Sequence, residues 1–397
     1  MWCRSGQNQT MLTDELLLAR LNRLCSVMAE RDVPFLLTAD PINICYATGA
    51  RNMTVYGMMG AVRFLLVSAD GTTVLWEFAG CDHLAAHLPT VDEVRRAPSV
   101  TATSGPGYTQ AAEIFAGEVM DECRRHGGDS RLGVERMDYQ VTDALRRTGF
   151  SLSSATEVFI GARMIKSPSE LDLMQTAADR VQTGVASMIE GIEPGRTEIE
   201  IWSEFHRHLI ATEGEYVVAR LVQSGERTFP YFHEAGTRPL ASGDLFSIDT
   251  DATGFGGYAV DFSRTFVCGG KQPSPVQRSL HGLALDQLQH NGSLLAPGRT
   301  FEEFANRAWA VPERYRPFGY YCLAHGLGLS GEHPNVPLAD PARAYNFAGQ
   351  FEPGMVICVE SYIGDPEHRQ GIKLEDQFVI TADGSRRITT FSLELTQ

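Results

Sequence analysis

Apolar and polar residues alternate along residues 245–251, which predicts a β-strand with Asp249 and Asp251 on one face. Three glycines follow and predict a turn centred near Gly256. With that centre, Asp251 and Asp261 would face each other across a hairpin, where two unpaired carboxylates repel. A bound cation would remove the repulsion. The pattern therefore predicts a buried acidic hairpin, and the alternative is a polar hairpin with solvated acids.

A second pair of predicted strands carries glutamates in the same way. Residues 355–362 and 371–380 are rich in β-branched and aromatic residues, and a loop over 364–371 separates them. The centre of that loop places Glu360 opposite Glu375. Because each acid lies inside an apolar strand, ordinary solvated surface does not explain the pair.

The tetrapeptide Pro-Gly-Arg-Thr occurs twice, at residues 194–197 and 297–300. An amphipathic helix is predicted before each copy, over about 168–190 and 274–295, and a further helix is predicted after each copy, over 199–210 and 301–309. The matching flanks indicate two half-domains related by an internal duplication. Each half would contribute one of the two acidic strand pairs.

The chain before residue 160 has a different pattern, which predicts a separate α/β domain. Thr13 is expected to cap an amphipathic helix. Short strands are predicted at 35–37, 43–48, 64–67 and 73–76, with a loop over 52–57 and a helix near 110–126. The predicted fold class is therefore α/β (α+β), with an N-terminal domain over 1–162 and a catalytic domain over 163–397.

One histidine, His325, lies in the apolar segment 320–329. A lone histidine in such a segment is more often a core residue. His325 is a candidate metal ligand only because the predicted acids accompany it. With the acids at 249, 251, 261, 360 and 375 it would form an oxygen-rich site for two divalent ions bridged by shared carboxylates. Manganese, iron, cobalt and catalytic zinc all suit that donor set, and the sequence does not choose among them.

Length and composition narrow the expected domain number, binding partners and location of the chain. The length of 397 residues suits two domains, and the net charge of -15 argues against nucleic acid and anionic membrane surfaces. The eight cysteines form no CxxC pair and no disulfide framework, so they are expected to be reduced. With no apolar leader and no stretch as long as a membrane span, the chain is expected to be soluble and cytoplasmic.

The order Asp, Asp, His, Glu, Glu on these elements resembles that of the pita-bread metalloenzymes, which include methionine aminopeptidase, the X-Pro peptidases and creatinase. The resemblance implies a creatinase-like N-terminal domain, a pita-bread catalytic domain and a homodimer. Within this fold the chain is most similar to the dimethylsulfoniopropionate lyase family DddP. The segments that carry this similarity are 40–48, 224–228, 249–251, 260–265 and 372–377.

This resemblance implies roles for individual residues. The implied metal ligands are Asp249, Asp251, Asp261, His325, Glu360 and Glu375. Asp249 is the aspartate that ordinary peptidases lack, Tyr320 matches a tyrosine near the substrate, and Tyr56 lies about where the lyases present a tryptophan. The implied reaction is a β-elimination, in which a base removes the proton next to the substrate carboxylate and dimethyl sulfide leaves.

The chain departs from the lyase pattern at two places. The lyases carry their presumed base, an aspartate, six residues after the ligand histidine, where this chain has Gly331. Glu332, His333 or Tyr320 would then have to accept the proton. His233 lies where the X-Pro peptidases carry a substrate-binding histidine, which favours hydrolysis.

Three functions therefore stay open at the level of the sequence. The first is a lyase for dimethylsulfoniopropionate or a related β-substituted carboxylate. The second is a metal-dependent hydrolase of a dipeptide or small amide, in which His233 and His333 position the substrate. The third is a metal-free binding module, which the complete ligand set disfavours.

Overall fold

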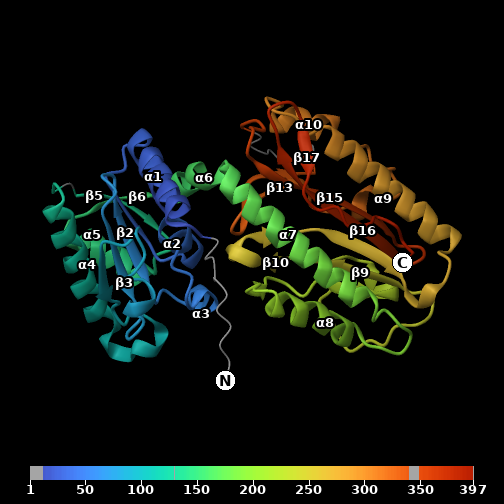
Figure 1. Ribbon diagram of the computed structural model, residues 1–397, viewed down its shortest axis with the longest axis horizontal. Helices are drawn as coiled ribbons and strands as arrows, with labels where there is room; N and C mark the ends of the chain where they lie inside the picture. The colour runs from blue at the N-terminus through green and yellow to red at the C-terminus, as the bar shows by residue number, and fades with distance from the viewer. Residues whose placement is uncertain (1–11, 129, 339–347, 397) are drawn as a thin grey trace, which may run out of the picture. The chain divides into compact units, whose positions relative to one another are not determined.

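The computed structural model describes residues 12–128, 130–338 and 348–396 and divides into two compact units, Met1–Arg163 and Met164–Gln397 (Figure 1). This division lies one residue beyond the boundary expected from the sequence. Both units combine helices with sheets, so the predicted α/β class is confirmed. Among the helices of the described ranges, none has the length and hydropathy needed to traverse a bilayer.

The first unit is built on a six-stranded sheet of order β4-β3-β2-β1-β5-β6. Its strands are β1 (Phe35–Thr38), β2 (Phe64–Ser68), β3 (Thr73–Glu77), β4 (Glu93–Arg96), β5 (Arg131–Glu135) and β6 (Ser151–Ser154). Its longer helices are α1 (Asp14–Glu30), α4 (Tyr108–Arg125), α5 (Tyr139–Thr148) and α6 (Thr156–Met164). Thr13 caps α1 as predicted, and Phe115 of α4 packs against Phe64 and Trp76 of the sheet.

The strand predicted at residues 43–48 is wrong, because this segment forms the helix α2 (Pro41–Thr48). The Asp40 side chain accepts hydrogen bonds from two backbone amides of the first turn, at 2.8 and 3.0 Å. Pro41 takes the first helical position, and Gly49 ends the helix in the left-handed conformation. These helix-end signals outweigh the β-propensity of the isoleucine, tyrosine and threonine between them.

The second unit contains two helix pairs whose N-termini repeat the same chemistry. The pairs are α7 (Pro168–Ile189) with α8 (Glu198–Ala211), and α9 (Pro275–Ser293) with α10 (Phe301–Arg307). Each of the four helices begins with a capping box, in which a serine or threonine and the residue three positions later satisfy each other's backbone amides. The predicted helices are thus confirmed, and α10 ends two residues earlier than expected.

The two Pro-Gly-Arg-Thr segments make equivalent backbone hydrogen bonds. Gly195 donates to the carbonyl of Leu240 at 2.8 Å, and Gly298 donates to the carbonyl of Phe351 at the same distance. In return the amides of Leu240 and Phe351 each donate to the arginine of the repeat at 2.9 Å. This equivalence supports the internal duplication predicted from the sequence.

Each half of the second unit contributes a sheet. The five-stranded sheet, of order β14-β13-β15-β16-β17, consists of β13 (Cys322–Leu327), β14 (Gly331–Pro337), β15 (Val356–Asp365), β16 (Gln370–Ile380) and β17 (Ser385–Arg387). The smaller sheets are formed by β7 (Tyr216–Val217), β8 (Val222–Ser224), β9 (Leu245–Asp249), β10 (Ala252–Thr253), β11 (Ala259–Val260) and β12 (Ser263–Val267). Leu280 and Leu288 of α9 share a core with Ile357, Ile363 and Leu374 of the large sheet.

The predicted acidic hairpin is present, but its strands are not continuous. Ala252 pairs with Val260, so the turn centres at Gly256 as predicted. The predicted strand over 245–251, however, ends at Asp249, and Asp251 has a φ of 38°, which breaks the extended backbone. Asp249 therefore ends the strand and Asp251 lies at a bend, so these two residues do not belong to one regular strand.

Candidate metal centre

The large sheet places two glutamates and a histidine on neighbouring strands. Glu360 of β15 pairs directly with Glu375 of β16, as the sequence predicts. His325 of β13 lies in the next strand, opposite Cys358 of β15. Glu360 and Glu375 are 2% and 0% exposed, so neither carboxylate is solvated. The sheet thus buries two acids beside one imidazole.

The hairpin acids reach this group because β12 is joined to β16 by side-chain hydrogen bonds. Thr265 Oγ donates to the carbonyl of Lys373 at 2.9 Å, and Ser263 Oγ donates to Glu375 Oε2 at 2.9 Å. Asp249 is the cross-strand partner of Ser263 and is itself buried. The acids of the first half are thereby held against the sheet of the second half.

The imidazole of His325 lies at the centre of the group. Its Nε2 atom is 3.7 Å from Asp261 Oδ2, 3.5 Å from Glu360 Oε1 and 3.6 Å from Glu375 Oε1. The thiol of Cys358 belongs to the same cluster, in which potential ligand atoms lie within 4.8 Å of one another. Cys358 was not predicted, although it precedes Glu360 by two residues on one strand and so must share its face.

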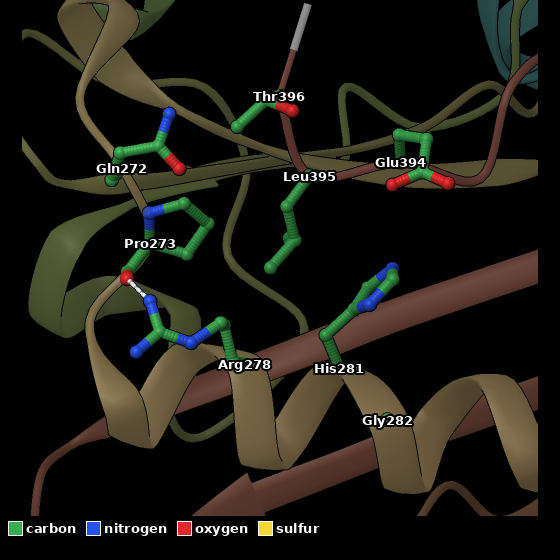
Figure 2. Close-up of a pocket in the computed structure, with 8 residues that line it drawn as sticks. All are labelled: Gln272, Pro273, Arg278, His281, Gly282, Glu394, Leu395 and Thr396. Atoms are coloured by element: carbon green, nitrogen blue, oxygen red, sulfur yellow. Dashed lines mark hydrogen bonds between the residues drawn. The ribbon is translucent and has the colours of Figure 1, made fainter.

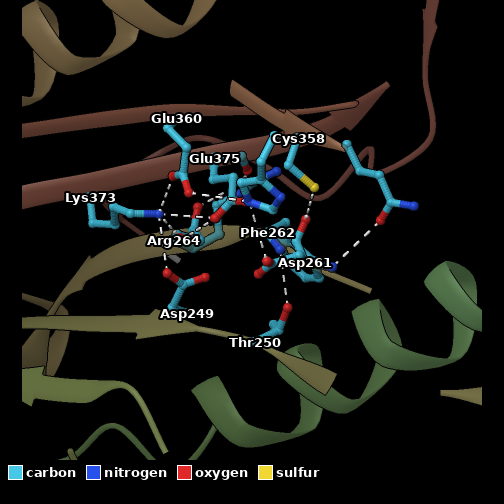
Figure 3. A network of polar contacts seen from close by, with 12 residues as sticks. Asp249, Thr250, Asp261, Phe262, Arg264, Cys358, Glu360, Lys373 and Glu375 are labelled. Carbon is cyan, nitrogen blue, oxygen red and sulfur yellow. Dashed lines mark hydrogen bonds and ion pairs between the residues drawn. The ribbon is translucent and has the colours of Figure 1, made fainter. Parts of the chain in front are cut away.

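Lys373 is the most important residue that the sequence analysis missed. Its Nζ atom lies 2.6 Å from Glu360 Oε2, 2.9 Å from Glu375 Oε2 and 3.1 Å from Asp249 Oδ2, and its side chain is fully buried (Figure 3). It also donates to Ser263 Oγ at 2.6 Å. The available signal was its position two residues before Glu375, which puts both side chains on one face of β16.

The pKa values reflect this crowding of charges. Burial and the neighbouring Asp249 raise the pKa of Asp251 to about 8, and burial and Glu375 raise the pKa of Asp261 well above its usual range. Burial alone would raise the pKa of Glu375 too, but Lys373 and His325 outweigh it and hold that pKa below its usual range. One ammonium group therefore does not balance all of the acids.

The residues present fit one or more divalent metal ions. Among the described residues, the buried oxygens Asp249 Oδ1, Asp261 Oδ1 and Glu375 Oε1 have no hydrogen-bond partner. Buried polar atoms are normally satisfied, so three such oxygens near one imidazole indicate a missing cation. Carboxylate oxygens with an imidazole nitrogen suit manganese, iron, cobalt or catalytic zinc.

Aromatic side chains lie next to the acids and form what we call the aromatic wall, defined as Tyr231, Phe232, Tyr320 and Tyr321. Phe232 stacks on Tyr320 with ring centroids 5.4 Å apart, and Tyr320 contacts both other rings. Lys373 Nζ is 4.8 Å from the Tyr320 ring centroid, and Tyr231 donates to Asp249 Oδ2 at 2.7 Å. Phe232 and Tyr321 are 55% and 56% exposed, so the wall runs from the buried acids to solvent.

The family model of metallopeptidase family M24 matches residues 172–382, which include every acid and histidine of the cluster. The chain belongs to metallopeptidase family M24. Its M24 relatives include the dimethylsulfoniopropionate lyase DddP of Roseovarius nubinhibens, which is 34% identical over 382 residues, or 94% of this chain and 86% of the relative. The Xaa-Pro dipeptidase of Pyrococcus furiosus is 24% identical over 95% of this chain and 99% of its own. These matches confirm the resemblance inferred from the sequence.

A solved structure supports the M24 fold independently. The prolidase of Pyrococcus horikoshii superposes with a TM-score of 0.77 and 22% sequence identity, covering 95% of this chain and 99% of that chain. The M24 relatives are lyases and peptidases, so the chain is an enzyme of one of these two kinds.

The structure separates the residues predicted to supply the base of this M24 chain. Glu332 forms an ion pair with Lys166 at 2.7 Å, with both side chains almost fully buried, and it accepts from the amide of Leu329. The exposed His333 contacts the ring of Phe301 in α10, with centroids 5.5 Å apart. The catalytic roles expected of Glu332 and His333 stay predictions.

Tyr320 belongs to the aromatic wall, and His233 directly follows a residue of this wall in sequence. His233 follows Phe232 of the aromatic wall, and its amide donates to Gln223 Oε1 at 3.1 Å. Its buried Nδ1 atom has no hydrogen-bond partner among the described residues. Burial, together with the charge of Glu360, raises the pKa of Tyr320, so its phenol stays protonated and is a poor proton acceptor.

Tyr56 lies in the first unit, on a short helix α3 (Thr54–Met59) where a loop was expected. Its ring meets Phe78 edge-on, with centroids 5.9 Å apart, and it is 43% exposed. Its contact with substrate stays a prediction.

An open pocket of about 320 Å³ lies between the start of α9 and the C-terminal segment of this M24 chain (Figure 2). Arg278, His281 and Glu394 line it, and none of its residues belongs to the acid cluster. Arg278 donates a hydrogen bond to the carbonyl of Pro273, and His281 Nε2 is hydrogen-bonded to the carbonyl of Leu393. These polar groups already serve to hold the chain together.

Proposed function

We propose that this M24 chain is a metal-dependent lyase that cleaves dimethylsulfoniopropionate, or a related β-substituted carboxylate, by β-elimination. The aromatic wall beside a buried acid cluster carries the proposal. A sulfonium cation is stabilised against aromatic faces, and the exposed faces of Phe232 and Tyr321 are accessible to it. The 34% identity with a dimethylsulfoniopropionate lyase supports the same reaction.

The proposal includes two divalent metal ions held by the acid cluster. Their ligands would be Asp249, Asp251, Asp261, His325, Glu360 and Glu375. Bound there, the ions would supply Lewis acidity that makes the proton next to the substrate carboxylate easier to remove. The acids themselves are held by Lys373, Ser263 and Tyr231, which leaves their remaining oxygens free for this task.

The elimination needs a proton acceptor, and we assign this role to His233. The base takes the proton from the carbon next to the carboxylate, a carbon–carbon double bond forms, and the carbon–sulfur bond breaks with its electron pair leaving on sulfur. The products are dimethyl sulfide and an acrylate. Glu332 is already paired with Lys166, whereas Nδ1 of His233 is buried without a described partner beside the aromatic wall.

A second function, hydrolysis of an X-Pro dipeptide or small amide, is favoured by the same histidine. An imidazole next to the aromatic wall could equally orient a peptide carbonyl, and a Xaa-Pro dipeptidase is 24% identical over 95% of the chain. The two functions differ in the bond that breaks. Cytoplasmic location and a homodimer stay predictions under either one.

The deciding experiment offers both substrates to metal-loaded protein. Purified enzyme reconstituted with iron, manganese, cobalt or zinc is incubated with dimethylsulfoniopropionate and, separately, with a set of X-Pro dipeptides. Gas chromatography detects dimethyl sulfide, and an amino-acid assay detects free proline. We expect dimethyl sulfide and acrylate in equal amounts; proline release without dimethyl sulfide would replace the lyase with the hydrolase. The Asp261→Ala variant serves as the control in each assay.

A further inference from the structure

Lys373 divides the two oxygens of each carboxylate that it contacts. Its Nζ atom lies next to Oε2 of Glu360, Oε2 of Glu375 and Oδ2 of Asp249, at 2.6 to 3.1 Å. The other oxygens of these glutamates, both Oε1, are the atoms that lie 3.5 and 3.6 Å from His325 Nε2. In each of these three carboxylates the ammonium group contacts one oxygen and not the other.

The oxygens that Lys373 leaves are available to a metal. Asp249 Oδ1 and Glu375 Oε1 are buried without a hydrogen-bond partner among the described residues, and Asp261 Oδ1 shares this property. A carboxylate that is bonded on one side cannot rotate freely, so its second oxygen keeps one direction. By contacting one oxygen each of Asp249, Glu360 and Glu375, Lys373 therefore fixes the direction in which the second oxygen of each acid points.

We propose that Lys373 is a positioning residue of the metal centre. It selects the carboxylate oxygens that bind the metals through its hydrogen bonds to Glu360 and Glu375 and its ion pair with Asp249. Lys373 also balances the charge of the additional aspartate, Asp249. Its ammonium group and the Tyr231 hydroxyl both contact Oδ2 of that acid. Two divalent cations and one ammonium group together neutralise the five carboxylates of the cluster. This inference rests on the metal centre of the proposed function but not on its substrate.

Besides the acids, three contacts hold the ammonium group in place, which suits a positioning role. Ser263 Oγ accepts from it at 2.6 Å, Tyr320 lies beneath it at 4.8 Å from the ring centroid, and Tyr231 lies 5.6 Å away. With a fully buried side chain, Lys373 has no route to solvent, and Figure 3 shows it pointing into the acids. Its own rotation is therefore restricted by the residues that it orients.

The test compares metal binding and cobalt spectra of two variants of the full chain. Lys373→Met keeps the length of the side chain and removes the donors, whereas Lys373→Arg keeps the charge but spreads the donors over a planar group. We expect both variants to bind cobalt(II) or manganese about 10- to 100-fold more weakly than the wild type, the usual loss when a residue that orients metal ligands is removed. The visible spectrum of cobalt(II) should shift in both, because the coordinating oxygens change.

Lys166→Met is the matched control, because it removes another buried lysine from a buried glutamate in the same unit. It should leave the metal affinity and the cobalt spectrum unchanged. If Lys373→Met does not fold, Lys373→Arg decides alone: an unchanged affinity and spectrum in Lys373→Arg would overturn the proposal. A wild-type protein that binds no metal would instead refute the metal centre itself, so the two failures are distinguishable.

Discussion

The two halves of the second unit deliver their acids in different ways. Glu360 and Glu375 lie in a regular ladder of cross-strand pairs that runs without interruption from Val356 to Asp365. In the first half the hairpin is broken at Asp251, and β9 and β10 pair with different neighbours. A regular ladder places two acids opposite each other, whereas a bend can direct acids from one strand toward a site beyond the sheet. The comparison shows that the duplicated halves keep their helices alike and differ where they meet the cluster.

The strongest test of this comparison removes one acid from each half. Asp261→Ala in the hairpin and Glu360→Ala in the ladder should each abolish metal binding and lower activity by more than about 1,000-fold, because each removes a carboxylate ligand and part of the negative charge that attracts the cations. Metal content after dialysis, measured by plasma mass spectrometry, gives the result. Glu367→Ala, at the exposed turn between β15 and β16, is the control. Full metal occupancy in both acid variants would mean that the cluster is not a metal centre.

The metal-free protein should lose stability as the pH rises, and the hairpin acid should cause this. The pKa of Asp251 is about 8 in the folded chain, against an ordinary value of 3.8. The folded state therefore holds a proton that the unfolded state releases, and stability falls between about pH 4 and pH 8. Glu375 of the ladder has a lowered pKa, so it acts in the opposite direction, and only near its ordinary value of 4.5 at the acidic end of this window.

Urea denaturation of metal-free protein at pH 5 and pH 8 measures this difference. Asp251→Asn should reduce the dependence without abolishing it, because the pKa of Asp261 is raised as well. Added metal should reverse the dependence, since metal binds the ionised acids. A metal-free protein that is more stable at pH 8 than at pH 5 would contradict the assignment of the proton to Asp251.

A smaller and opposite effect is expected from restoring an acid in the second half. Gly331 opens β14, and a Cβ atom built on it meets no other atom within 4 Å. Gly331→Asp should therefore fold normally and, by the resemblance to the lyases, raise the rate of dimethyl sulfide release by about 100-fold, at the low end of what a general base contributes. Gly331→Asn, which cannot accept the proton, is the control. Equal rates in the two variants would show that position 331 does not face the substrate.

The smallest effect is expected in the first half, at the exposed rim of the aromatic wall. Phe232→Ala should raise the KM for dimethylsulfoniopropionate about 2- to 30-fold, which corresponds to the loss of about 0.5 to 2 kcal/mol of cation–π attraction. The kcat should change little, because Phe232 touches the cation and not the reacting carbon. Phe232→Tyr should restore the KM, and a neutral substrate should show no change. A KM that does not respond to Phe232→Ala would place the cation elsewhere.

Sequence patterns predicted the regular parts of this molecule and failed where local geometry is irregular. The alternation in β15 and β16 gave the facing pair Glu360 and Glu375, and the repeated Pro-Gly-Arg-Thr gave the two helix pairs. The bend at Asp251 was missed because a left-handed residue in a hairpin has no side-chain pattern of its own. The strand prediction for residues 43–48 fails because the capping aspartate and the proline at the start of α2 outweigh its β-branched residues.

The candidate site was predicted as far as its anionic residues, and its cationic and aromatic residues were missed. A search for metal ligands selects carboxylates and histidines, so Lys373 was passed over even though its strand position puts it beside Glu375. The aromatic wall was recognised only at Tyr320, since Tyr231 and Phe232 come from a loop whose path depends on tertiary packing. Contacts between segments 90 residues apart are not visible as a local pattern.

The duplication also has a consequence for how such a centre could arise. Asp249, Asp251 and Asp261 come from the first half, and His325, Glu360 and Glu375 from the second, so neither half alone carries a complete set of donors. An ancestor that possessed one half would have completed a comparable centre only by associating with a second copy of itself. In the single chain the two halves can differ: one carries a straight ladder with a lysine, and the other carries a bend and an additional aspartate.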